Sequence, residues 1–403
     1  MIWGFKKFCF RVIHNAMYLA QKILRFREPM LLRNEGSIKK LPKVIKDMGI
    51  NNVLIVTDET LVKLGLLNDL LESLNKEKIK HTIYAGVQPN PIIGNIEEAR
   101  RIYLENSCEG VIAFGGGSPM DCAKAAAARI TNNKSVRRMR GYFKLRKELP
   151  PIFAVPTTSG TGSETTIAAV VSDPETHEKY AIMDLKLTPK VAVLDPNLTV
   201  GLPKHITGTT GMDALTHAVE AYIGVSGTRF TNERSEKAVK LIFENLEKVY
   251  NNGSDLEGRN QMALASYYAG EAFTRASVGY IHAIAHNLGG LYGVPHGLAN
   301  AVVMPYVLDY FGESIHKKLA KLAIIGGIGS KEEPDSILAI KFIEHIKIMN
   351  VNMNIPLVIK ELKEEDIELI AKRAVKEGNP SYPVPKIMKE EEFKIILKKL
   401  LVS

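Results

Sequence analysis

Short apolar runs alternate with helix-like segments through the first half of the chain, and this alternation limits the possible fold more than any other feature. Strands are predicted at residues 53–56, 81–84, 111–114 and 152–155. Helices are predicted from Glu59 onward and over residues 96–106 and 119–130. Such an order favours parallel βαβ units, which bind ligands at the carboxyl ends of their strands. Residues 167–194 contain β-branched runs and are expected to add strands at the sheet edge.

The pattern changes after Leu202-Pro203, where strand signals nearly vanish and helical periodicity continues to Ser403. A chain of 403 residues is long enough for two domains. We therefore predict an α/β dinucleotide-binding domain over residues 29–202, with a parallel, Rossmann-like sheet. An all-α domain follows over residues 203–403, and the active site is expected in the cleft between the two domains.

Residues 1–28 form a basic, amphipathic extension. They carry a net charge of +5 out of the +9 of the whole chain. Apolar residues recur at helical spacing over residues 5–24, which predicts a helix. Two hypotheses remain open: peripheral contact of residues 5–24 with an anionic membrane, or packing of this helix on its own domain or on another subunit. Arg11 interrupts the apolar run and no small-residue cleavage site follows, so a signal peptide is not expected.

The cysteine content and the absence of nucleic-acid motifs predict a cytoplasmic protein without nucleic-acid partners. Cys9, Cys108 and Cys122 are too few and too widely spaced for a disulfide framework or a thiolate metal site. The sequence contains no apolar run of 18 residues, so no transmembrane span is predicted. It contains no nucleic-acid-binding motif either.

Two polar loops follow predicted strands. Gly115-Gly116-Gly117-Ser118 leads from a strand into a helix, where a close backbone approach and free N–H groups suit a pyrophosphate. The loop over residues 156–164 is rich in hydroxyls and glycines and could bind phosphate or ribose, although Thr161 or Ser163 could instead cap a helix. Asp58 follows another strand. It could bond a ribose hydroxyl and favour NAD over NADP, or it could be a turn or N-cap residue.

Potential metal ligands gather in the helical half. Asp213 and His217 are four residues apart, as are His282 and His286, so each pair shares one face of a helix. His296 follows ten residues later. A carboxylate with imidazoles suits Fe²⁺, Zn²⁺ or a similar divalent ion. Position 283 is alanine, so the general-base glutamate of a zinc protease motif is missing and a metalloprotease is not expected.

These segments together resemble the iron-containing (group III) alcohol dehydrogenase family over about residues 30–403. The resemblance implies that Asp213, His217, His282 and His296 hold the metal, Fe²⁺ or alternatively Zn²⁺. It implies that His286 lies beside the nicotinamide and acts in catalysis, and that the chain forms a homodimer. It also implies a set of positions near the cofactor, which would be NAD or alternatively NADP: Asp58, Asn90, Gly116, Gly117, Ser118, Asp121, Thr157, Thr158 and Lys179.

Two departures from the family pattern concern the N-terminus and the substrate. Residues 1–28 extend beyond the usual family start, and the sequence around Arg275 and Asn287 differs from the common pattern. One hypothesis is that Arg275 faces the cleft and favours an anionic substrate; the other is that it pairs with a structural carboxylate.

The predicted function is hydride transfer between NAD(P) and a small alcohol or aldehyde. One alternative is an NAD-using lyase of the dehydroquinate-synthase-like branch, which would show no net NADH consumption with aldehydes. Another is a membrane-associated, non-catalytic member of the family, which would show neither bound metal nor turnover.

Overall fold

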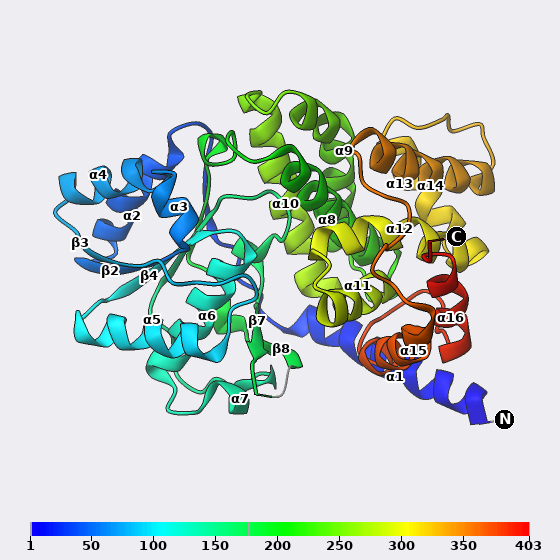
Figure 1. Ribbon diagram of the computed structural model, residues 1–403, viewed down its shortest axis with the longest axis horizontal. Helices are drawn as coiled ribbons and strands as arrows, with labels where there is room; N and C mark the ends of the chain where they lie inside the picture. The colour runs from blue at the N-terminus through cyan, green and yellow to red at the C-terminus, as the bar shows by residue number, and fades with distance from the viewer. Residues whose placement is uncertain (1, 176–177, 403) are drawn as a thin grey trace. The chain divides into compact units, whose positions relative to one another are not determined.

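The computed structural model describes residues 2–175 and 178–402, which form two compact units (Figure 1). Residues 26–201 make an α/β unit. Residues 1–25 and 202–403 together make a helical unit, so the first helix of the chain belongs with the second half of the sequence.

A six-stranded parallel sheet organises the α/β unit. Its order is β1-β9-β6-β4-β2-β3. The strands are β1 (Met30–Arg33), β9 (Val191–Leu194), β6 (Ile152–Pro156), β4 (Gly110–Gly115), β2 (Asn52–Val56) and β3 (Lys80–Tyr84). Five helices accompany the sheet: α2 (Leu41–Asp47), α3 (Glu59–Lys63), α4 (Asn68–Lys76), α5 (Ile93–Glu105) and α6 (Gly117–Thr131). The predicted α/β fold with a parallel sheet is confirmed.

Both faces of the four inner strands of this sheet are buried, which explains why these strands are largely continuous apolar runs. In β2, Leu54 and Val56 face a core shared with α5 and α6. Val53 and Ile55 face a second core, which contains Leu41 of α2 and Leu70 of α4. The side chains of successive residues point to opposite faces of a strand, so a single run supplies both cores.

The prediction for residues 167–194 was wrong in one respect. The last strand, β9, lies inside the sheet, between β1 and β6. The two strands before it, β7 (Ala168–Asp173) and β8 (Glu178–Met183), pair antiparallel in a separate small sheet with β5 (Gly141–Tyr142), which follows α7 (Val136–Met139). Strand order depends on long-range pairing, which local patterns do not specify.

The helical unit is built around one large apolar core. Its helices are α1 (Ile2–Ile23), α8 (Lys204–Ile223), α9 (Arg229–Asn251), α10 (Leu256–Ala276), α11 (Tyr280–Tyr292), α12 (His296–Phe311), α13 (His316–Ile325), α14 (Asp335–Asn352), α15 (Ile367–Gly378) and α16 (Glu390–Lys398). The predicted all-α second half is therefore confirmed. Of the helices described, none combines the length and apolar character that crossing a bilayer requires.

Polar contacts attach α1 to the rest of the helical unit. The Arg11 guanidinium donates hydrogen bonds of 2.6 Å to the carbonyls of Val384 and Pro385. The His14 ring is fully buried, and its Nε2 lies 3.0 Å from the Pro380 carbonyl. Further along the helix, Gln21 donates to the backbone at Ser226. One face of α1 therefore packs on its own unit, as one of the two sequence hypotheses expected.

Replacing Arg11 by alanine should loosen this helix. Arg11→Ala leaves two partly buried carbonyls without donors, which costs about 1–3 kcal/mol of stability in the helical unit. We expect a lower melting temperature and faster proteolysis between residues 24 and 29. The matched control is Asn15→Ala, because Asn15 is exposed on the same helix. Equal proteolysis of the two variants would show that Arg11 does not hold α1 in place.

Candidate metal centre and cofactor loop

Three helices of the helical unit bring four potential metal ligands together. Asp213 and His217 lie on α8, His282 lies on α11, and His296 is the first residue of α12. One ligand atom from each side chain lies within 4.8 Å of the others. The Asp213 carboxylate is 3.5 Å from Nε2 of His296 and 3.9 Å from Nε2 of His282. All but His296 are buried.

A glycine allows α12 to approach α8 closely at this point. A Cβ atom on Gly297 would lie only 2.4 Å from the Thr209 carbonyl and 3.4 Å from the Asp213 side chain. Any side chain would therefore push the first turn of α12, and His296 with it, away from Asp213. The glycine after His296 is thus part of the geometry of the cluster.

The buried carboxylate of Glu220 holds the ring of His282. One of its oxygens lies 2.6 Å from His282 Nδ1, and its two oxygens accept backbone hydrogen bonds of 2.7 Å from Gly279 and Ile281. This contact turns Nε2 of His282 toward Asp213, as carboxylates commonly do for metal-binding histidines. Burial raises the pKa of Glu220 to about 8 and lowers that of His282 well below its usual value. The neutral imidazole that results is the form that binds metals.

Asn300 lies among the candidate ligands, and the sequence analysis missed it. Its amide nitrogen is 2.7 Å from the Asp213 carboxylate and 3.2 Å from Nε2 of both His282 and His296. Its buried Oδ1 makes no hydrogen bond in the structure. Asn300 follows His296 by one helical turn, and that spacing was the only sequence signal available. A buried set of oxygen and nitrogen donors with this composition fits a divalent transition-metal ion.

His286 lies beside this cluster but has a different partner. Its Nδ1 is 2.6 Å from the carboxylate of Glu377 on α15, and the Tyr382 hydroxyl donates to the same oxygen at 2.8 Å. The ring stacks on that of His296, with centroids 5.3 Å apart. His286 is part-exposed, whereas His282 is buried. Glu377 and Tyr382 were not predicted, since nothing local in the sequence links them to His286.

The glycine-rich loop of the α/β unit lies where β4 ends and α6 begins. Gly116 is the N-cap residue and Gly117 the first residue of α6. Ser118 accepts a hydrogen bond of 3.1 Å from the backbone of Asn90, and Asn90 accepts one of 2.9 Å from Lys179. A Cβ atom on Gly116 would lie 3.3 Å from the Thr158 hydroxyl. Six of the predicted cofactor positions therefore gather at one helix N-terminus, where a phosphate is favoured.

A buried lysine secures the second polar loop. Lys124 of α6 donates to the backbone carbonyls of Ser163, Thr166 and Ala168 at 2.6, 2.9 and 3.1 Å. Asp121, one turn earlier, accepts from the Ser163 hydroxyl at 3.4 Å. Thr157 begins the loop, is buried, and donates its N–H to the carbonyl of Gly115.

The alternative interpretation, in which Thr161 or Ser163 is the N-cap of a helix, does not hold. A short 3-10 helix begins at Ser163 and its N-cap is Gly162, which has a left-handed backbone with φ of 58°. A left-handed turn of this kind favours glycine over residues with side chains. The turn that it makes brings Ser163 and Thr166 onto Lys124.

The structure shows the contacts of Asp58 and Arg275, for each of which the sequence left two interpretations open. Asp58 follows β2 and is the N-cap of α3, where its side chain accepts the N–H of Leu61 at 3.0 Å. The Arg275 guanidinium lies 3.7 Å from the centre of the Phe230 ring, a stacking that neither hypothesis for Arg275 expected.

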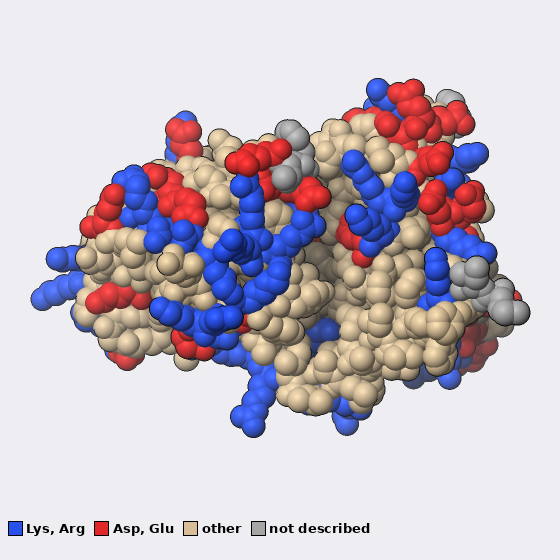
Figure 2. All heavy atoms as spheres, turned by 90° about the horizontal axis from the view of Figure 1, so that it is seen from below, with Lys and Arg blue, Asp and Glu red and all other residues tan. Residues whose placement is uncertain are grey.

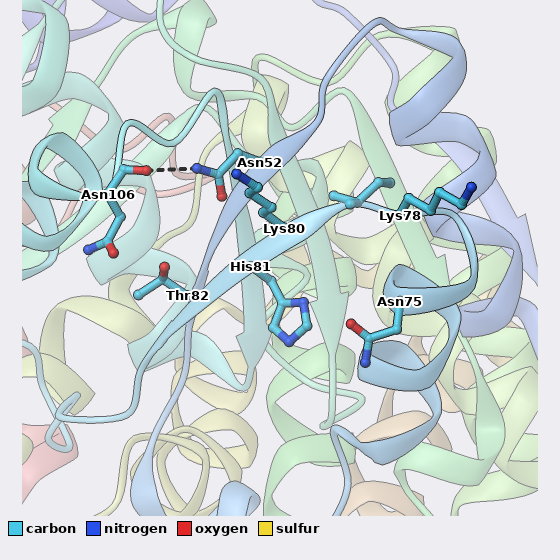
Figure 3. A pocket seen from close by; sticks show the side chains of 8 residues that line it. Asn52, Asn75, Lys78, Lys80, His81, Thr82 and Asn106 are labelled. Carbon is cyan, nitrogen blue, oxygen red and sulfur yellow. Dashed lines mark hydrogen bonds between the residues drawn. The ribbon is translucent and has the colours of Figure 1, made fainter.

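A surface pocket occurs at the other end of the same sheet (Figure 3). It is lined by Asn52, Lys80 and Asn106, among others, so it lies where β2 and β3 begin. Asn52 donates to the Asn106 carbonyl at 2.7 Å across one side of it. Parallel sheets bind ligands at their carboxyl ends, so this pocket is separate from the glycine-rich loop.

Comparisons with known proteins agree with this geometry. Residues 29–196 match the model of the family described as iron-containing alcohol dehydrogenase, and residues 207–401 match its C-terminal model. Alcohol dehydrogenase 4 of Schizosaccharomyces pombe is 37% identical over 91% of this chain and 86% of its own length. The NAD-dependent methanol dehydrogenase of Bacillus methanolicus is 36% identical over 87% of this chain and 92% of its own.

A solved structure has the same fold along nearly the whole chain. The alcohol dehydrogenase from Oenococcus oeni is 36% identical, with a TM-score of 0.90 over 93% of this chain and 99% of its own. The two family models between them span both units, and the relatives are 36–37% identical over most of their length. Both findings assign the chain to the same family. The chain belongs to the iron-containing alcohol dehydrogenase family.

Proposed function

We propose that this protein transfers a hydride between NAD and a small alcohol or aldehyde, with iron or zinc held by Asp213, His217, His282 and His296. The observation that carries the proposal is the cluster itself, whose four ligand atoms lie within 4.8 Å of one another. The relatives are named as alcohol dehydrogenases, and one is named as NAD-dependent. When bound, the metal supplies Lewis acidity at the substrate oxygen, and the nicotinamide supplies or accepts the hydride.

The chain's own residues orient the ligands and move the proton. Glu220 fixes the His282 ring, and Asn300 donates to the Asp213 carboxylate. His286 is the part-exposed histidine beside the cluster, so it is the group suited to pass the alcohol proton toward solvent. Its contact with Glu377 at Nδ1 fixes the orientation of the ring.

NAD rather than NADP is favoured by the carboxylate of Asp58 beyond β2, and a homodimer by the family resemblance alone. A reducing, cytoplasmic compartment suits the three free cysteines.

The first test concerns the metal. His282→Ala removes a ligand from a buried cluster, so we expect purified protein to lose most of its metal by mass spectrometry and its aldehyde reduction to fall at least about a hundredfold. The control is His345→Ala, because His345 of α14 packs against Phe243 of α9 and its loss should leave the metal content unchanged. Full metal content in His282→Ala would remove the proposed ligand set.

The second test separates His286 from the ligands. His286→Ala should keep its metal but lower kcat by about 10²–10⁴-fold, the usual contribution of a positioned acid–base group. Glu377→Gln, which weakens the contact that orients the ring, should lower kcat by less and leave KM nearly unchanged. Glu368→Gln is the control, because Glu368 is exposed on the same helix. Metal loss in His286→Ala would contradict the assignment.

The third test concerns the cofactor. Asp58→Asn keeps a side chain that caps α3 equally well but removes the charge that would repel a 2′-phosphate. We expect the ratio of NADPH to NADH activity to rise at least about fivefold, which corresponds to a loss of about 1 kcal/mol of repulsion. Asp58→Ser should behave similarly, since it also caps. A ratio unchanged in both variants would show that Asp58 is only an N-cap.

A further inference from the structure

The first helix of the chain has a second apolar face that packs on nothing described in the helical unit. The side chains that form this outer face of α1 are exposed: Phe5, Phe8, Val12, Ala16, Leu19 and Ile23. At 100° per residue they fall within an arc of roughly 80°. The exposed fractions of Phe5, Phe8 and Ile23 are 69%, 65% and 79%.

The polar contacts of the opposite face determine which way this surface points. His14 and Gln21 lie on the far side of the helix and Arg11 lies at its edge, and all three are hydrogen-bonded to the helical unit. The helix therefore cannot roll to bury Phe5 and Phe8 without breaking those bonds. The way in which α1 is attached therefore leaves this apolar face exposed.

Positive charge surrounds the outer face. Lys6 and Lys22 flank it on either side, and Lys7 and Arg25 are also exposed. No aspartate or glutamate occurs before Glu28. An apolar arc bordered by cations, with no acid on the helix, is the chemistry of helices that lie in the interface of an anionic bilayer.

We propose that the outer face of α1 docks on the surface of a bilayer that contains anionic phospholipid. The helix would lie parallel to the surface, with Phe5, Phe8 and Ile23 at the acyl boundary and the lysines among the headgroups. A second copy of α1 fits less well, because pairing two such faces would bring Lys6 and Lys22 of both helices together without an acid between them.

The exposed face of α14 shows what distinguishes the outer face of α1. Ile337, Ile340, Ile348 and Val351 are exposed at the same helical spacing. Glu344 lies within that row and pairs with Lys347 at 2.6 Å. Both helices therefore expose apolar area, but the α14 face contains an acid, whereas the outer face of α1 is flanked by lysines and α1 carries no acid. The α14 face supplies the matched control.

A second stretch, in the α/β unit, also combines cations with exposed aromatic side chains. Residues 134–147 of the α/β unit hold seven lysines and arginines and no acid, with Tyr142 and Phe143 exposed among them. Two of these cations pair with acids elsewhere, Arg137 with Asp173 and Arg140 with Glu178. Figure 2 shows Lys and Arg side chains gathered on the exposed face of the α/β unit.

The test is sedimentation of the full-length protein with lipid vesicles. Phosphatidylcholine vesicles are compared with vesicles that also contain phosphatidylglycerol. We expect binding only to the latter, with weakening as salt is raised. Phe5→Ser combined with Phe8→Ser should lower the partition coefficient about tenfold or more. Ile340→Ser combined with Ile348→Ser should leave it unchanged.

The proposal would be overturned if the two double variants partitioned equally, if the protein bound equally to vesicles without phosphatidylglycerol, or if it bound no vesicles at all. It would also be overturned if the Phe5/Phe8 variant had a lower molar mass than the unsubstituted protein in lipid-free solution, measured by light scattering, because the face would then be assigned to a second copy. Unchanged melting temperature and dehydrogenase activity confirm that the variants are folded. The proposed function does not depend on this outcome, since none of the substituted residues belongs to the metal centre.

Discussion

The close approach of α8, α11 and α12 is the constraint on which the functional half of the molecule depends. A carboxylate and three imidazoles converge only because Gly297 lets α12 contact the backbone of α8 at Thr209. The same helices supply much of the apolar core. The metal centre is therefore part of the packing of the unit, and a change in the helix crossing would move the ligands as directly as it would move the core.

Placing this much polarity in an apolar core requires a partner for every polar group. A buried polar group that loses its hydration without gaining a hydrogen bond costs several kcal/mol. Glu220 meets this need with two backbone N–H groups and the His282 ring, and Asp213 does so with the amide of Asn300. These second contacts orient the ligands and also make the buried site tolerable. Orientation and stability here come from the same hydrogen bonds.

Local patterns were sufficient for part of this arrangement and not for the rest. The pairs Asp213/His217 and His282/His286 could be predicted because residues i and i+4 share a helix face. The strand at residues 53–56 could be predicted because both of its faces are apolar. Glu220 and Glu377 reach their histidines from 62 and 91 residues away. No periodicity in a single sequence reports such contacts. The interior position of β9 was missed for the same reason, since its neighbours β1 and β6 are distant in the chain.

The N-terminal helix shows how a pattern can satisfy two hypotheses at once. Its apolar residues were compatible with packing on the protein or with lying on a membrane, and both faces of the helix turn out to carry apolar side chains. The attachment relies on Arg11 and His14, whose polar contacts specify rotation about the helix axis more sharply than apolar area does. Hydrophobic contact alone would favour whichever face buries more surface. The directional bonds explain why Trp3 and Phe10 face inward while Phe5 and Phe8 remain outside.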